Sequence, residues 1–275
     1  MRLRNEVVLT LVVILVCGIA GEAVASWAVP SGHQDRHPVG KQNPCAVPKI
    51  RKERGLLCPD LTISQPYELH GGGGGHRRIL RATSSVNSVG RGPAELHGRR
   101  NGWHTMQASQ RVRKKGGGFA RFHTKAKLHF KQIPGQGRYW KFHNAARFEL
   151  WSLDRHGKRK RRVAVGPKVD YCLRDLEHTG PGRPHSPGGP VYPGCSQNPN
   201  RDSVTLGTSV GWSDIYPSTY HEQFIRTKNV SHAGCYSFVM IVDPTNKILE
   251  LNERNNASSK KVFLTAGGRY RPGRC

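Results

Sequence analysis

The chain has 275 residues, and its 44 Lys and Arg against 18 Asp and Glu give a formal net charge of +26 at pH 7. Its 32 Gly and 18 Pro break the apolar runs into short pieces, and no long apolar run has a helical period, which argues against a helical bundle. This composition predicts an all-β fold, an antiparallel β-sandwich with long Gly/Pro-rich loops. The length leaves room for one main domain with a sizeable core.

The N-terminal residues have the pattern of a secretory signal. Two arginines precede an apolar run at residues 7–20, and an Ala-Val-Ala motif stands immediately before Ser26. A membrane anchor is the alternative, but a run of roughly 14 apolar residues is shorter than the ~20 that span a bilayer. We therefore expect residues 1–25 to be a signal peptide, and the mature chain to be secreted without a transmembrane segment.

Beyond this segment six cysteines remain, namely Cys45, Cys58, Cys172, Cys195, Cys235 and Cys275. An even number in a chain bound for an oxidising compartment predicts disulfides rather than metal ligands or nucleophiles. No two of them have the CxxC spacing of a zinc site. Cys172 and Cys195 bracket a Gly/Pro-rich excursion, so we prefer that pairing among several, with a stabilisation of roughly 3 kcal/mol.

The excess positive charge gathers in patches, among them residues 111–115 (RVRKK) and 158–162 (KRKRR). Such patches attract polyanions, and the candidates are an acidic polysaccharide, nucleic acid or a membrane surface. The alternative is that they are solvated loops and hairpin tips without a ligand. Aromatic residues do not interleave with the basic runs, as a face that binds single-stranded nucleic acid would require.

Composition divides the mature chain into three parts. Residues 26–77 form a low-complexity, Gly-rich N-terminal segment that ends in five glycines at 71–75, which are typical of a linker. Within this segment, residues 61–63 could add an edge strand. Residues 78–266 form the main domain, and residues 267–275 are a basic C-terminal tail.

Short runs of alternating or β-branched residues, bounded by turn residues, predict the strands of the main domain. They lie at residues 79–86, 94–97, 106–112, 125–130, 145–153, 161–165, 235–242, 247–251 and 260–264. The fifth and sixth are expected to form a hairpin around residues 156–158, and the seventh and eighth another around residues 243–246.

Several short motifs follow one another between residues 79 and 264. No single motif is specific for a family, but their order and spacing together are. They are VN and GRGP (86–93), TMQ (105–107), ARFEL (146–150), GPK (166–168), YCLRD (171–175), YPGC (192–195), VGWSDIY (210–216), VDP (242–244) and ELNERNN (250–256). Together they resemble the lysyl oxidase family of copper-dependent amine oxidases, in the form of its small secreted bacterial-type members.

The resemblance implies a cofactor built from two side chains. In that family a lysine and a tyrosine combine into lysine tyrosylquinone, and Lys168 and Tyr216 fall on those positions. The quinone carbonyl forms a Schiff base with a primary amine or peptidyl lysine, which is then oxidised to an aldehyde. Taken separately, Lys168 has the alternative of a surface lysine, and Tyr216 that of a packed, hydrogen-bonded tyrosine.

The copper site that the resemblance implies departs from the family pattern. The family uses a His-x-His-x-His run upstream of the strand at 146–150, and counting back from Phe148 places its positions at Gly137, Tyr139 and Lys141. None of the three is histidine. Copper(II) favours imidazole nitrogens that project in one direction, so the copper ligands are missing at these positions.

Other histidines lie near this segment, namely His123, His129 and His143. Their spacing disfavours a local triad, because His123 and His129 share one face of an extended strand yet lie about 20 Å apart. His143 remains the candidate metal ligand, and alone it cannot hold copper.

Three functions therefore stay open. The first is a secreted lysyl oxidase-like protein that keeps the Lys168 and Tyr216 pair but lacks copper, and acts as a non-catalytic binding or structural module. The second is an active copper amine oxidase with unusual ligands. The third is an immunoglobulin-like adhesion or polyanion-binding module, which residues 243–256 resemble, and which agrees with a β-sandwich but leaves the Lys168 and Tyr216 match unexplained.

Overall fold

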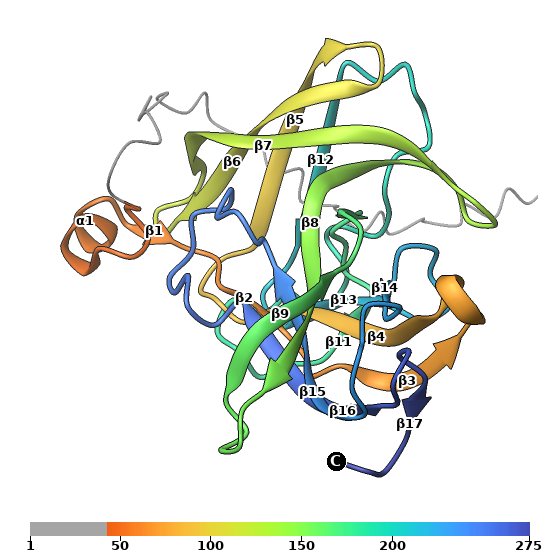
Figure 1. The fold of residues 1–275 in the computed structure, drawn as a ribbon. Helices are drawn as coiled ribbons and strands as arrows, with labels where there is room; N and C mark the ends of the chain where they lie inside the picture. Colours follow the sequence, from red (N-terminus) through yellow and green to blue (C-terminus); the bar gives the residue numbers. More distant parts are fainter. Residues whose placement is uncertain (1–42) are drawn as a thin grey trace, which may run out of the picture. The chain divides into compact units, whose positions relative to one another are not determined.

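The structure, a computed structural model, describes residues 43–275, and the expected signal peptide lies outside them. Within the described residues two antiparallel sheets, of 11 and 6 strands, pack against each other around the larger apolar core (Figure 1). The helical segments described are short: α1 (Pro48–Glu53) and a 3-10 turn (Gly75–Arg77). The prediction of an all-β, antiparallel sandwich is confirmed.

The larger sheet has an unbroken path of eight neighbouring strands in the described residues. In order they are β12 (Ser203–Thr208), β5 (Ala94–Gly102), β6 (Thr105–Lys114), β7 (Phe119–Ile133), β8 (Gly137–Leu153), β15 (Gly234–Val242), β16 (Ala257–Leu264) and β17 (Tyr270–Arg271). Off this path, β1 (Leu56–Leu57) pairs with β6, while β9 (Arg159–Val165) and β10 (Val169–Tyr171) pair with β8.

The smaller sheet is built around β4. Its path is β11 (Glu177–His178), β13 (Trp212–Tyr216), β4 (Ile79–Ser88) and β14 (Phe224–Arg226), and β2 (Leu61–Ile63) and β3 (Tyr67–Gly72) also pair with β4. β4 therefore pairs with strands that precede it in the chain, β2 and β3, and with strands that follow more than 120 positions later, β13 and β14.

The long strand β8 changes partners along its length. It pairs with β7 as far as Phe142 and with β15 from Ala146 onward. Between these, Asn144 has a φ of 55°, a left-handed conformation that Asn adopts more easily than most residues. The Asn144 N–H donates to Asp170 Oδ1 at 2.7 Å, and this hydrogen bond stabilises the bend.

Alternation along the strands decides which side chains are buried. In β6 and β7 buried and less buried positions alternate, as in strands with one face on a core. In β8, Trp140, Phe142 and Phe148 are all buried. Phe148 packs edge to face on Phe238 of β15, with ring centroids 6.2 Å apart. Burial of each such side chain contributes about 1.5–3 kcal/mol.

Most strands lie where the sequence predicts them. The runs at 79–86, 94–97, 106–112, 125–130, 145–153, 161–165, 235–242 and 260–264 correspond to β4, β5, β6, β7, β8, β9, β15 and β16, and the edge strand suggested at 61–63 is β2. The hairpin of β8 and β9 around residues 156–158 is also present. Several strands, β7 and β8 above all, are longer than predicted because pairing with neighbours extends them beyond the alternating residues.

The strand predicted at residues 247–251, with its hairpin to β15, is wrong. β15 pairs instead with β16, because other partners take the backbone groups of the predicted strand. Asp243 Oδ2 accepts the N–H of Ile248 at 2.7 Å, and Leu249 exchanges hydrogen bonds of 2.7 and 2.9 Å with the side-chain amide of Gln110. Backbone groups satisfied in this way cannot form a ladder.

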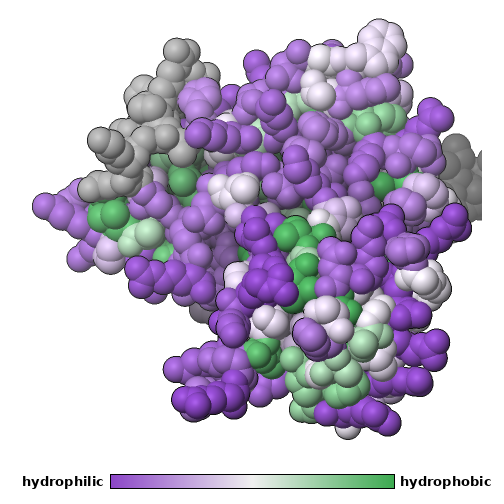
Figure 2. Space-filling view, viewed as in Figure 1, coloured by the Kyte–Doolittle hydropathy of each residue, from purple (hydrophilic) through white to green (hydrophobic). Residues whose placement is uncertain are grey.

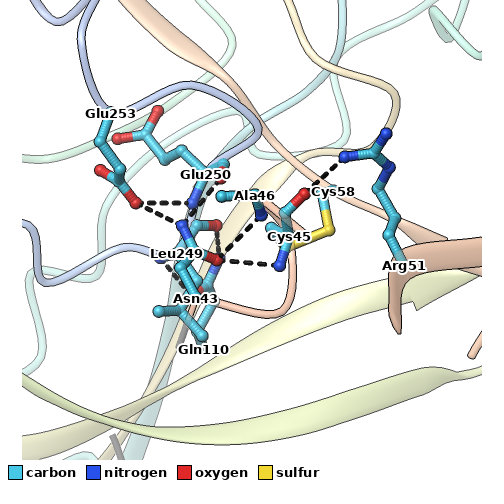
Figure 3. Close-up of a disulfide and its surroundings, with 9 residues drawn as sticks. All are labelled: Asn43, Cys45, Ala46, Arg51, Cys58, Gln110, Leu249, Glu250 and Glu253. Carbon is cyan, nitrogen blue, oxygen red and sulfur yellow. Dashed lines mark hydrogen bonds between the residues drawn. A yellow bond between two sulfur atoms is a disulfide. The ribbon is translucent and has the colours of Figure 1, made fainter. Parts of the chain in front are cut away.

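The N-terminal part of the described chain is joined to the segment after β15 beside a disulfide (Figure 3). Cys45 and Cys58 are bridged and fully buried. The side-chain amide of Asn43 donates to the backbone oxygen of Glu250 at 2.9 Å and to Glu253 Oε1 at 2.7 Å. These bonds connect residues more than 200 positions apart in the sequence.

Both segments that flank the predicted main domain add strands to the sheets. β1, β2 and β3 all precede residue 78 and pair with β6 or β4. β3 ends at Gly71 and Gly72, where an added Cβ would lie 3.3 Å from side-chain atoms of Tyr270 and Ile79 respectively, so glycine permits this close approach. The domain limits given above stay a prediction, and the structure adds that the sheets extend past them on both sides.

Three disulfides are present in the described residues, namely Cys45–Cys58, Cys172–Cys195 and Cys235–Cys275. The bridge between Cys172 and Cys195 joins the ends of the Gly/Pro-rich excursion, as preferred from the sequence. Among the described residues, we find no helix with the length and apolar character needed to cross a bilayer.

Candidate functional site

Tyr216, the tyrosine that the resemblance assigns to the cofactor, ends β13 in a group of three tyrosine rings. Its ring stacks on that of Tyr171 in β10, with centroids 3.6 Å apart and planes 10° apart. The ring of Tyr220 meets it edge-on at 5.3 Å. β13 belongs to the smaller sheet and β10 to the larger, so the stack joins the two sheets. Such a ring pair contributes about 0.5–1.5 kcal/mol beyond the burial of its area.

The Tyr216 hydroxyl has two hydrogen-bond partners. It donates to the carboxylate of Asp214 and accepts the backbone N–H of Cys172 at 2.8 Å. Burial, and then the negative charge of Asp214, raise the pKa of Tyr216 well above its ordinary value. Burial also raises the pKa of Asp214 to about 7. Tyr216 is therefore held as a neutral phenol at pH 7.

Tyr220 connects this group to Lys141 on β8. The Lys141 ammonium donates to the Tyr220 hydroxyl and lies 5.0 Å from the ring centroid. The lysine is only 3 % exposed. Burial lowers the pKa of Lys141 to about 8, against the opposing effect of the carboxylates of Glu222, Asp214 and Asp170. A buried cation thus occupies one of the positions where the family resemblance implies a copper ligand.

The other two implied copper positions offer no imidazole. Gly137 begins β8 with a φ of 98° and has no side chain. Tyr139 has its ring 5.5 Å from the Lys141 ammonium. A glycine supplies no donor, and a neighbouring ammonium repels a metal cation. These three residues do not fit copper.

Lys168, the lysine assigned to the cofactor, lies between β9 and β10 with an exposed side chain. Its positive charge helps to lower the pKa of Lys247, after the effect of burial. Among the described residues, no hydrogen bond, ion pair or ring contact joins Lys168 to Tyr216. Cys172, whose backbone bonds Tyr216, stands beyond the extended β10, about 13 Å along the chain from Lys168.

His143 has partners that spacing along one strand did not indicate. β7 and β8 pair with His129 opposite Lys141, so His143 lies diagonally across on the same face. The rings of His129 and His143 stack with centroids 4.0 Å apart and planes 22° apart. His143 Nδ1 lies 3.1 Å from Asp170 Oδ1. Ligand atoms of His129, His143 and Asp170 all lie within 4.8 Å of one another.

Two imidazoles and a carboxylate are a donor set that transition metals accept, but here His143 and Asp170 are bonded to each other, and Asp170 has further protein partners. Asp170 Oδ1 also accepts the Asn144 N–H, and its Oδ2 lies 3.3 Å from the ammonium of Lys131. Lys131 in turn bonds Glu222. A metal bound by Asp170 Oδ2 would have to displace Lys131, so the present arrangement is a hydrogen-bonded network.

Sequence reasoning missed Asp170, Tyr171 and Tyr220, which complete the site. A signal was present for the first, since Asp170 is an acid between the apolar residues Val169 and Tyr171, and a buried acid usually has a specific partner. Nothing in the sequence placed Tyr220 against Lys141. His123 remains apart from the site, exposed on β7 opposite Ser109.

Comparison with known proteins identifies the family of the chain. A family model described as lysyl oxidase matches residues 109–270, which is more than half of the 275 residues and includes Lys168, Tyr216 and the strand β13 that carries Tyr216. No curated protein matches the chain. The chain belongs to the lysyl oxidase family.

Proposed function

We propose that this member of the lysyl oxidase family is not catalytic and acts as a secreted binding or structural module. The observation that carries the proposal is the buried ammonium of Lys141, which bonds the Tyr220 hydroxyl at a position where the family resemblance implies a copper ligand. The three disulfides support an oxidising, extracellular location.

At the position where the family resemblance implies a copper ligand, Lys141 places a positively charged ammonium instead. The carboxylates of Glu222, Asp214 and Asp170 act on its charge and balance part of it. A divalent ion brought to the same face would meet this positive charge in surroundings of low dielectric constant, where repulsion is stronger than in water. The local charges therefore favour the lysine over a metal.

The positions of Lys168 and Tyr216 also support the proposal that the protein is not catalytic. The quinone requires a covalent bond between the lysine nitrogen and the tyrosine ring. Here Lys168 is exposed, whereas the Tyr216 ring is 5 % exposed and is covered by Tyr171 on one face. With its hydroxyl engaged by Asp214 and Cys172, Tyr216 fits the role of a packed tyrosine.

The competing function is an amine oxidase that holds copper at different residues. The observation in its favour is the group His129, His143 and Asp170, which offers three ligand atoms within 4.8 Å of one another. Copper bound there would supply the oxygen chemistry of the family. The ion pair of Asp170 with Lys131 is the observation against it.

The two functions differ in whether the protein releases hydrogen peroxide from primary amines. The mature protein, loaded with copper(II) in air, is assayed with a primary monoamine and with a lysine-containing peptide. We expect no amine-dependent peroxide above that of free copper. Release that is lost in Tyr216→Phe and in His143→Ala, and kept in the control Tyr270→Phe, contradicts the proposal and establishes the oxidase.

A further inference from the structure

A basic groove lies between the tip of the β8–β9 hairpin and strands β15 and β16. It has a volume of about 530 Å³. Four cations and two hydroxyl groups contribute to its lining, namely Lys158, Arg159, Lys260, Lys261, Ser237 and Ser259. Figure 2 shows hydrophilic side chains covering the hairpin tip at the lower left of the view. None of the lining residues belongs to the tyrosine and histidine site described above.

The two sides of the groove are held close together at the hairpin turn. Asp154 Oδ1 accepts the backbone N–H groups of His156 and Lys158 at 2.9 Å each, which fixes the turn. Gly157 has a φ of 74°, and a Cβ added to it would lie 3.2 Å from the Lys261 Nζ. The Lys261 ammonium of β16 therefore approaches the hairpin turn at Gly157, where the absence of a side chain leaves room for it.

The charges of this groove are not neutralised by the protein. Among the described residues, none of the four lining cations forms an ion pair with a carboxylate, and no acidic residue lines the groove. The neighbouring Arg162 differs, because Glu149 binds it at 3.1 Å. Four unpaired cations that line one concave surface repel one another and attract a polyanion, which releases its counterions on binding.

We propose that this groove binds a sulfated polysaccharide. The lysine and arginine groups suit sulfate oxygens, and the serine hydroxyls can donate to the same oxygens. No aromatic side chain lines the groove, so it lacks the stacking platforms that bind single-stranded nucleic acid. A disulfide-bonded chain also meets acidic polysaccharides in the oxidising space where such bridges persist. The proposal for this groove does not depend on the proposed loss of catalysis. It applies whether or not the domain is an oxidase.

The test measures binding of a heparin octasaccharide by titration calorimetry at several NaCl concentrations. The groove variant replaces Lys158, Arg159, Lys260 and Lys261 with Gln. The control variant replaces Lys114, Lys115, Lys125 and Lys127, which lie on or beside β6 and β7, with Gln and so removes the same charge elsewhere. Circular dichroism and non-reducing peptide mapping verify that both variants fold.

We expect the wild-type affinity to fall about 100-fold between roughly 50 and 200 mM NaCl, as four phosphate-like contacts would give. At fixed salt the groove variant should bind about 10-fold or more weakly and lose about three units of salt slope, with little change in the control. Equal losses in both variants, or no loss in the groove variant, overturn the proposal. Tighter binding of a short DNA duplex that depends on the groove assigns it to nucleic acid and overturns the polysaccharide.

Discussion

The rings of Tyr171 and Tyr216 stack with their centroids 3.6 Å apart and their planes 10° apart, although the residues belong to different sheets. Both hydroxyls are hydrogen-bonded: that of Tyr216 as described, and that of Tyr171 to Ser84 and Gln223. The stack is therefore a polar connection inside the sandwich as well as an apolar one. The stack therefore leads to predictions about the stability of the fold, and these do not depend on any catalytic role.

Removal of the Tyr216 hydroxyl should destabilise the fold. Tyr216→Phe keeps the ring and its stack but leaves the Cys172 N–H without a partner and removes the hydrogen bond to Asp214 Oδ2, while Asp214 keeps its ion pair with Arg174. We expect a cost of about 1–3 kcal/mol. Denaturant unfolding with the disulfides intact measures this change. The matched control is Tyr139→Phe, since the Tyr139 hydroxyl makes no hydrogen bond among the described residues, and its free energy of unfolding should change by less than about 0.5 kcal/mol. Equal effects of the two substitutions would refute the assigned bonds.

Asp214 should make stability fall as the pH rises toward neutrality. Its pKa in the folded protein is raised to about 7 by burial, above that of the unfolded chain near 3.9. The folded state therefore binds the proton more tightly, and the stability that this provides is complete below about pH 4 and lost up to about pH 7. Asp214→Asn should lack this loss, so unfolding curves of the two proteins should diverge over that range. Parallel pH profiles would show that Asp214 has an ordinary pKa.

Lys141 should have the opposite pH dependence at alkaline pH. Burial lowers its pKa to about 8, below the value of about 10.4 in the unfolded chain. Its contribution to stability is present above about pH 10.4 and is lost as the pH falls through about 8. Between these limits wild type should lose stability relative to Lys141→Met as the pH is lowered. The exposed Lys127, replaced by Met, serves as the control and should leave the profile unchanged; the same profile in both variants would contradict the buried ammonium.

The disulfide between Cys172 and Cys195 should stabilise the Gly/Pro-rich segment between the two cysteines, which contains β11. The two residues are 23 positions apart, and a closed loop of that length contributes about 3 kcal/mol in the chain-entropy account. The double variant Cys172→Ser with Cys195→Ser should lose about this free energy of unfolding. Because Cys172 also bonds Tyr216 through its backbone, tyrosine fluorescence should change on the same variant. A loss below about 1 kcal/mol would mean that the excursion is held by packing instead.

The sequence predicted what depends on local pattern. Alternation located the strand at 125–130 within β7, and turn residues located the β8–β9 hairpin. The error at residues 247–251 has a tertiary cause, because the amide of Gln110, far away in the sequence, takes the backbone groups of Leu249. No local pattern contains that partner.

The candidate site was harder to predict because its contacts cross between strands. Spacing along one strand separated His123 from His129 and disfavoured a triad, yet strand pairing brought His129 against His143. A strand pair creates diagonal neighbours that no single strand contains. The same holds for Lys141, which a count of residues placed at a copper position but which only the structure sets against Tyr220.

The most direct test of the central claim, that the cofactor pair is not joined, is tryptic peptide mapping of the mature protein after incubation with copper(II) in air. If Lys168 is a free amine, trypsin cleaves after it and releases residues 163–168, while Tyr216 is recovered unmodified in residues 202–226. We predict both peptides at their unmodified masses and no quinone absorbance. A single cross-linked species that contains Lys168 and Tyr216, with a quinone absorbance, would contradict the account and establish a working oxidase cofactor.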